Sequence, residues 1–157
     1  MRPYIPRFAP LMLCLALAAC GGDAPKPAPR IEAPQEAVSR VGDVTVRANV
    51  LLTEGLAEAM AQQYGIERDP GTVMLLVSVR QGPEGRDTAL PATVDATVAN
   101  LQGQRQTLAM REIRSGEYVD YVGTAKVSPP DTLRFDLKIV REGDAASTMT
   151  FSRDFAR

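Results

Sequence analysis

The chain has 157 residues, of which 45% are apolar and 24% charged. This composition is typical of one folded globular domain of about 100 to 200 residues. The 18 basic and 19 acidic residues leave a formal net charge of −1, so the basic excess that marks nucleic-acid-binding proteins is absent. The sequence contains no histidine, which excludes histidine-based acid–base catalysis and histidine-ligated metal sites.

The N-terminus has the organisation of a signal peptide. Arg2 and Arg7 precede an apolar stretch, residues 11–18, that is too short to span a bilayer. The end of this stretch and the two residues after it read Leu17-Ala18-Ala19-Cys20, a segment that resembles the lipobox of bacterial lipoproteins. The resemblance implies cleavage after residue 19 and lipidation of Cys20. Ordinary secretion, with cleavage after the Ala-Leu-Ala of residues 16–18, is the alternative.

The residue after Cys20 is Gly21. Among lipoproteins, Asp at this position favours retention at the inner membrane. Its absence predicts a lipid-anchored protein at the periplasmic face of the outer membrane. Cys14 leaves with the signal peptide and Cys20 carries the lipid, so the mature domain is expected to contain no disulfide.

A proline-rich segment follows the predicted anchor. Residues 21–36 read GGDAPKPAPRIEAPQE, a composition that favours polyproline II or disorder over packing. We predict three parts: a signal peptide over residues 1–19, a lipidated cysteine and tether over residues 20–40, and a folded domain over residues 41–157.

The folded part alternates apolar and polar residues with a period of two, as half-buried strands do. About seven such strands, separated by short turns, predict an immunoglobulin-like antiparallel β-sandwich. Their approximate ranges are residues 44–52, 73–79, 94–98, 108–110, 119–127, 133–139 and 149–155. The nearly continuous apolar run of residues 73–79 predicts a central strand covered on both faces. The break in alternation at Ile113 predicts a bulge or strand end nearby.

One helix is expected over residues 54–64, with Thr53 as its N-cap and Gly65 as its left-handed C-terminal residue. Its apolar face comprises Leu56, Ala59, Met60 and Tyr64.

Several segments occur together in the order of a known family. They are Tyr64-Gly65-Ile66, residues 100–104 (NLQGQ), residues 111–114 (REIR) followed by Gly116 and Tyr121, and residues 133–136 (LRFD). Over residues 41–157 the chain resembles the bacterial envelope family known as domain of unknown function 4426. The resemblance implies a small secreted β-rich domain with no assigned activity, so it supplies no catalytic residues. Many members have a plain signal peptide, whereas this chain has a segment that resembles a lipobox and a predicted proline-rich tether.

Catalytic chemistry finds little support in the sequence. The lysines expected in the folded domain, Lys126 and Lys138, fall on polar strand faces, which argues against a serine–lysine pair. Carboxylates at Asp95, Glu112, Asp120 and Asp136 suit a hydrolase in residue type, but they fall on solvent-facing or terminal strand positions. The methionines Met60, Met74, Met110 and Met149 are predicted to fill the core rather than to bind copper.

The hairpin around Ser115 and Gly116 carries the candidate partner-binding residues, which are Arg111, Glu112, Arg114, Tyr118 and Asp120. Arginine and tyrosine are favoured at binding hot spots, although cross-strand pairing alone also explains such a cluster. The sequence thus predicts a non-catalytic binding or accessory module of the cell envelope, with no cofactor and no metal. Its expected partners are the membrane, through Cys20, and an envelope protein. The alternatives are a carboxylate-based hydrolase and a carrier of a small apolar ligand.

Overall fold

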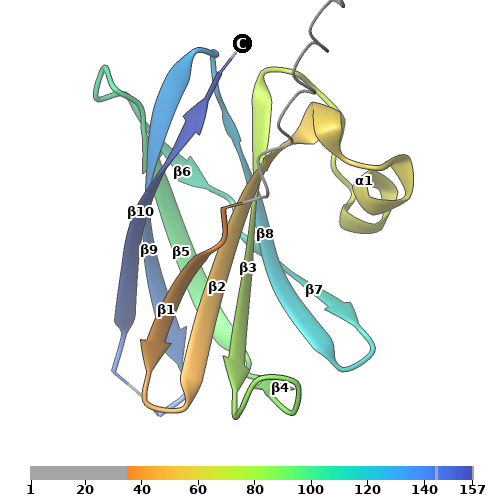
Figure 1. Ribbon diagram of the computed structural model, residues 1–157, viewed down its shortest axis with the longest axis vertical. Coiled ribbons are helices and arrows are strands. Elements are labelled where there is room, and N and C mark those ends of the chain that lie inside the picture. Colours follow the sequence, from red (N-terminus) through yellow and green to blue (C-terminus); the bar gives the residue numbers. More distant parts are fainter. Residues whose placement is uncertain (1–34, 144, 157) are drawn as a thin grey trace, which may run out of the picture. The chain divides into compact units, whose positions relative to one another are not determined.

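The computed structural model describes residues 35–143 and 145–156, which form two antiparallel sheets and one α-helix (Figure 1). The predicted signal peptide, Cys20 and most of the predicted tether lie outside the described residues. Within the described part of the chain, no helix has the length and apolar character needed to cross a bilayer.

The larger sheet has six strands. Its strands are β1 (Ala37–Val41), β2 (Val44–Leu52), β3 (Thr72–Gln81), β4 (Thr88–Ala89), β7 (Arg111–Ser115) and β8 (Tyr118–Lys126). Their order is β1-β2-β3-β8-β7, and β4 pairs with the end of β3. β3 is therefore the central strand that its continuous apolar run predicts.

The smaller sheet has four strands in the order β10-β9-β5-β6. They are β5 (Ala92–Ala99), β6 (Arg105–Leu108), β9 (Asp131–Arg141) and β10 (Ser147–Phe155). The described residues thus contain ten strands, whereas the sequence predicted about seven. The three additional strands are short: β1, β4 and β7.

Strand β1 shows why a short edge strand escaped prediction. It begins at Ala37, inside the segment assigned to the tether, and pairs with β2 from Ala37↔Ala48 to Val41↔Val44. Its two valines remain exposed, Val38 at 43% and Val41 at 52%. The apolar residues of β1 therefore do not mark a buried face, and a strand of this kind is hard to predict from the sequence. The folded domain consequently starts before the predicted boundary at residue 41.

The main core lies between the two sheets. Alternate side chains of β3 and β9 supply its centre, and each of them is at most 2% exposed. They are Val73, Leu75, Val77 and Val79 from β3 and Leu133, Phe135, Leu137 and Ile139 from β9. Each such side chain contributes about 1.5 to 3 kcal/mol when it leaves water. Because bulky side chains fill this space, the sandwich interior gives no support to the apolar-carrier alternative.

A second apolar cluster covers the opposite face of β3. Met74 of β3 and Val122 of β8 are both 0% exposed and pack with Leu56, Ala61 and Tyr64 from the helical segment. This face of the six-stranded sheet, which points away from the smaller sheet, is called the outer face below. The helix lies beside it in Figure 1.

The helical segment is shorter than predicted. A 3₁₀ turn, η1 (Thr53–Gly55), precedes α1 (Glu58–Tyr64), and the residue before α1, Ala57, is extended. Thr53 does not cap the helix, because its buried hydroxyl bonds to Asp69 instead. Shifting the helix start moves its buried face to Ala61 and Tyr64. Met60, predicted to face the core, is 41% exposed, and Ala59 is exposed too.

The predicted end of the helix is confirmed. Gly65 adopts the left-handed conformation, with φ of 57° and ψ of 44°. The Ile66 amide then donates to the Ala61 carbonyl at 2.8 Å, and the Ile66 side chain is buried in the second cluster.

The chain changes sheets between β6 and β7. β6 pairs with β5 in the smaller sheet and ends at Leu108, whereas β7 pairs with β8 in the larger sheet and begins at Arg111. The break in strand structure therefore falls at Ala109 and Met110, just before Ile113. Ile113 itself lies within β7 and packs against the second apolar cluster.

Candidate functional site

The cross-strand register of the β7–β8 hairpin divides the predicted partner-binding residues between two faces. Ile113 pairs with Asp120, and Ser115 pairs with Tyr118, whereas Glu112 pairs with Tyr121. Since directly opposed residues of an antiparallel pair share a face, Arg111, Tyr118 and Asp120 belong to the outer face. Glu112 and Arg114 point to the other face, where they form an ion pair with each other. The five predicted residues do not form one patch.

Arg111 fastens the end of α1 to the hairpin. Its guanidinium donates hydrogen bonds to the carbonyl oxygens of Tyr64 and Gly65, the latter at 3.4 Å. These carbonyls end the helix and lack partners within it, so a cation is a suitable donor for them. Arg111 has a structural contact that its sequence position did not reveal.

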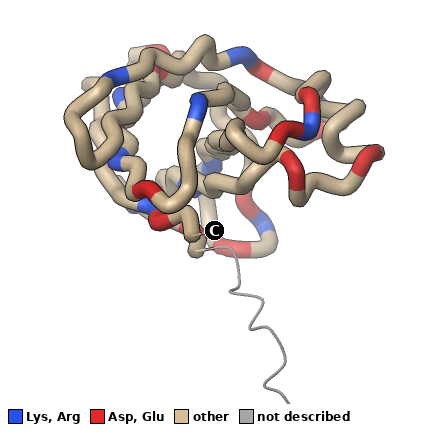
Figure 2. The backbone as a smooth tube through the Cα atoms, turned by 90° about the horizontal axis from the view of Figure 1, so that it is seen from above, with Lys and Arg blue, Asp and Glu red and all other residues tan. Residues whose placement is uncertain are grey.

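Tyr118 and Asp120 line a groove with a volume of about 570 Å³. Five carboxylates surround it, supplied by Glu36, Glu84, Asp87, Glu117 and Asp120, against the two guanidinium groups of Arg47 and Arg80. This acidic groove opens on the outer face. Elsewhere, acidic and basic residues are interspersed along the backbone (Figure 2).

The two arginines of the acidic groove already have anionic partners. Arg80 Nε lies 3.1 Å from Asp87 Oδ2, and Arg47 Nη1 lies 2.7 Å from Glu36 Oε2. The Arg80 guanidinium also lies over the Tyr118 ring, 5.1 Å from its centroid. Tyr118 nevertheless remains 61% exposed.

Asp120 connects the acidic groove to the helix. Its Oδ2 lies 3.5 Å from the Tyr64 hydroxyl, a long hydrogen bond. Burial is the main reason that the pKa of Asp120 lies above its ordinary value, while the Tyr64 hydroxyl and Arg80 act against that rise. Burial and the nearby Asp120 likewise raise the pKa of Tyr64. Asp120 is thus less exposed than the sequence suggested.

The four predicted carboxylates do not meet in one cleft. Asp95 and Asp136 lie in the smaller sheet, where Asp95 pairs with Lys138 and Asp136 accepts a hydrogen bond from Thr150 at 2.8 Å. Glu112 and Asp120 lie on opposite faces of the β7–β8 hairpin. Because the four carboxylates lie at separate places, they do not together form the acid and base pair of a carboxylate-based hydrolase.

Metal-ligating side chains are dispersed over the described residues, which contain no cluster of three or more carboxylates or thiols suited to a metal ion. Met74 lies beneath the helix, Met149 lies between the sheets, and Met60 is on the solvent side of α1.

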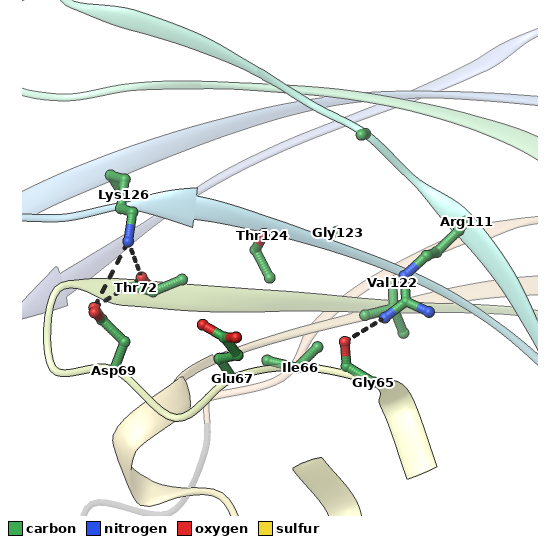
Figure 3. A pocket seen from close by; sticks show the side chains of 11 residues that line it. Gly65, Ile66, Glu67, Asp69, Thr72, Arg111, Val122, Gly123, Thr124 and Lys126 are labelled. Carbon is green, nitrogen blue, oxygen red and sulfur yellow. Dashed lines mark hydrogen bonds and ion pairs between the residues drawn. The ribbon is translucent and has the colours of Figure 1, made fainter. Parts of the chain in front are cut away.

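A second groove, with a volume of about 450 Å³, lies at the other end of β8 (Figure 3). The loop of residues 65–71 forms one wall, and β8 together with the β6–β7 connection forms the other. Lys126 Nζ lies 2.8 Å from Thr72 Oγ1 and 3.8 Å from Asp69 Oδ1. Hydrogen bonds from the Thr72 hydroxyl and the Gly71 amide, aided by Lys126, hold the pKa of Asp69 below its ordinary value.

This polar groove was missed by the sequence analysis. Asp69, Pro70 and Gly71 are residue types typical of a turn, but such residues give no information on which strand the turn lies beside. Arg111 and Lys126 supply positive charge to the groove, and Glu67 and Asp69 supply negative charge, so the groove is balanced overall.

These features define a small antiparallel β-sandwich whose shaped polar surfaces lie outside a filled core. The family comparison agrees: the family model described as domain of unknown function DUF4426 matches residues 38–156. The chain belongs to this family, which confirms the resemblance seen in its sequence segments.

Solved structures show the same fold. A DUF4426 family protein from Pseudomonas aeruginosa superposes with a TM-score of 0.66 at 24% identity, over 77% of this chain and 94% of that one. FetP from uropathogenic Escherichia coli strain F11, expressed in the periplasm, gives a TM-score of 0.53 at 12% identity, over 79% of this chain and 95% of that one. A copper-bound variant of FetP gives 0.55 at 12% identity, over 78% of this chain and 91% of that one. A comparison with curated proteins finds no match.

Proposed function

We propose that this protein is a non-catalytic binding or accessory module of the bacterial cell envelope. In this proposal Cys20 carries a lipid anchor in the outer membrane, and the proline-rich tether presents the folded domain to the periplasm. The observation that supports a binding role is that the acidic groove lies on the surface, outside a filled core. The interior is filled with apolar side chains, while Tyr118 and Asp120 line an open groove on the outer face.

The partner we propose for the acidic groove is an envelope protein that presents lysine or arginine side chains. Five carboxylates against two guanidinium groups give the groove a negative balance, and both guanidinium groups already have carboxylate partners. An incoming cation would find Glu117 and Asp120 in the groove wall and the exposed ring of Tyr118 beside them.

Photo-crosslinking in cells tests this proposal. A photoreactive phenylalanine analogue replaces Tyr118, and the same analogue at Thr148, exposed on the smaller sheet, serves as the matched control. We expect one discrete protein adduct from position 118 that position 148 does not give. Adding Glu117→Lys to the position-118 variant should strongly reduce the adduct, because the new charge repels a basic partner.

Equal adduct patterns from positions 118 and 148 would contradict the assignment of the partner surface to the acidic groove. An adduct that Glu117→Lys leaves unchanged would contradict the proposed basic character of the partner.

A further inference from the structure

The edge of β8 is only partly covered by β7. Pairing between these strands runs from Ser115↔Tyr118 to Arg111↔Val122, after which the chain crosses to the smaller sheet. β8 itself continues to Lys126, which pairs with Thr72 of β3 on the other side. Residues 123–126 of β8 therefore have a strand neighbour on one side only.

The side chain of Gln106 occupies the far end of this edge. Its Nε2 donates to the Lys126 carbonyl at 2.8 Å, and its Oε1 accepts from the Lys126 amide at 2.8 Å. The Gln106 carboxamide thus takes the place of a residue of a neighbouring strand. Like a peptide group, it is planar and can both donate and accept a hydrogen bond. These bonds also show that the main-chain groups of Lys126 point toward the open edge.

Thr124 lies between the Gln106 side chain and the end of β7. Main-chain groups alternate direction along a strand, so those of Thr124 point the same way as those of Lys126. Among the described residues, no hydrogen bond joins Thr124 to the β6–β7 connection. Ala109 and Thr124 both line the polar groove. The main-chain donor and acceptor of Thr124 therefore point to the part of the β8 edge that β7 does not pair, beside the polar groove.

The opening is too short to accept another strand, because Arg111 and Gln106 occupy the positions on either side of it. The opening suits a small planar group that can donate one hydrogen bond and accept another at the same time. The surroundings carry two cations and two anions, with Glu67 placed between the loop and Thr124 in Figure 3. We propose that the main chain of Thr124 binds a carboxamide, as Gln106 already does at Lys126, and that an asparagine or glutamine of an extended peptide supplies it.

This inference is independent of the proposed role of the acidic groove. Two sources can supply the same chemistry, a peptide side chain or a small primary amide, and a volume of about 450 Å³ is large enough for either.

Nuclear magnetic resonance titration of the isotope-labelled full chain tests the proposal, with the Thr124 amide signal as the readout. The probes are a short alanine peptide with a central glutamine, the same peptide with norleucine, and propionamide. We expect the glutamine peptide to shift the Thr124 signal and the norleucine peptide to bind about tenfold more weakly, the effect of two lost hydrogen bonds. A shift with propionamide but not with the glutamine peptide would support a small amide as the source.

Equal binding of the glutamine and norleucine peptides would overturn the proposal, and so would an unmoved Thr124 signal with every probe at millimolar concentration. Ala109→Leu, which adds bulk to a lining residue of the same groove, should abolish the shift. Ala59→Leu, on the exposed side of α1, is the matched control and should retain it. If Ala109→Leu loses the dispersed spectrum of a folded chain, Ala109→Val applies the same test with a smaller side chain. A shift retained in the folded groove variant would also refute the assignment.

Discussion

A side chain at Gly123 would crowd the two residues at which the chain changes sheets. A Cβ atom built there would lie 2.5 Å from Met110 Sδ and 3.1 Å from Leu108 Cβ. Its backbone is ordinary strand, so the requirement for glycine arises from packing rather than from a positive φ.

Gly123→Ala should therefore lower the free energy of unfolding by about 1 to 3 kcal/mol, the usual cost of overpacking. Urea denaturation followed by circular dichroism measures it. Gly55→Ala is the matched control, since its Cβ meets nothing within 4 Å, and we expect a change near zero. Adding Met110→Ala to Gly123→Ala should recover part of the loss. Equal stabilities of the two alanine variants would contradict the steric account.

Thr53 is another residue whose role depends on distant contacts. It is 0% exposed, and its hydroxyl accepts from the Asp69 amide and donates to the Asp69 carbonyl, both at 3.0 Å. The hydroxyl thereby joins the end of β2 to the loop that enters β3.

Thr53→Val keeps the shape of the side chain but leaves the Asp69 amide without its partner. It also removes one of two hydrogen bonds to the Asp69 carbonyl, which still accepts from the Thr72 amide at 3.3 Å. We expect a loss of about 1 to 3 kcal/mol in the free energy of unfolding, the cost of unsatisfied buried groups. Thr148→Val, at an exposed position of β10, should change it by less than about 0.5 kcal/mol. If the two variants are equally stable in chemical denaturation, the Asp69 contacts do not stabilise the fold.

At the scale of elements, α1 is held to the sheet by apolar packing and by two polar contacts. Arg111 binds the carbonyls at the end of α1, and the Tyr64 hydroxyl faces Asp120 of β8. The Asp120 contact depends on pH. Because the pKa of Asp120 is raised in the folded state, its protonated form favours folding. That contribution is complete below the unfolded pKa of about 3.9 and is lost as pH rises through the folded pKa.

Asp120→Asn removes the cost of a partly buried charge. Relative to the parent chain, it should be more stable near neutral pH, and the difference should shrink toward zero as pH falls below about 4. Unfolding free energies measured across this range test the sign. Asp95→Asn, at an exposed position of β5, controls for the loss of one negative charge. A neutral-pH destabilisation specific to Asp120→Asn would mean that the ionised carboxylate is the stabilising form.

At the scale of the whole molecule, the chain is divided between a predicted anchor and a folded domain. The anchor prediction rests on Leu17, Ala18, Ala19 and Cys20, which stand at the end of the apolar stretch. Their position is local information that the sequence alone provides. One acyl chain binds a bilayer only marginally, at about 0.8 kcal/mol for each buried methylene, so firm attachment requires two or more chains.

Cys20→Ser removes the thiol that would carry the lipid and should move the protein from the membrane fraction to the soluble periplasmic fraction. Fractionation with immunodetection measures this distribution. Cys14→Ser, within the predicted signal peptide, is the matched control and should leave the distribution unchanged. Continued sedimentation of Cys20→Ser with membranes would refute the lipid anchor.

The sequence by itself determined most of the strands, the mainly β class and the family, because alternation with a period of two and turn residues such as Gly65 are local properties. Only the tertiary structure decided which residues meet. The pairing of β7 with β8 separates Glu112 from Asp120, although both were assigned to one patch. Thr53 bonds to Asp69 instead of capping a helix, and the polar groove joins residues that are far apart in the chain. Such contacts depend on long-range register, which no local pattern of residues encodes.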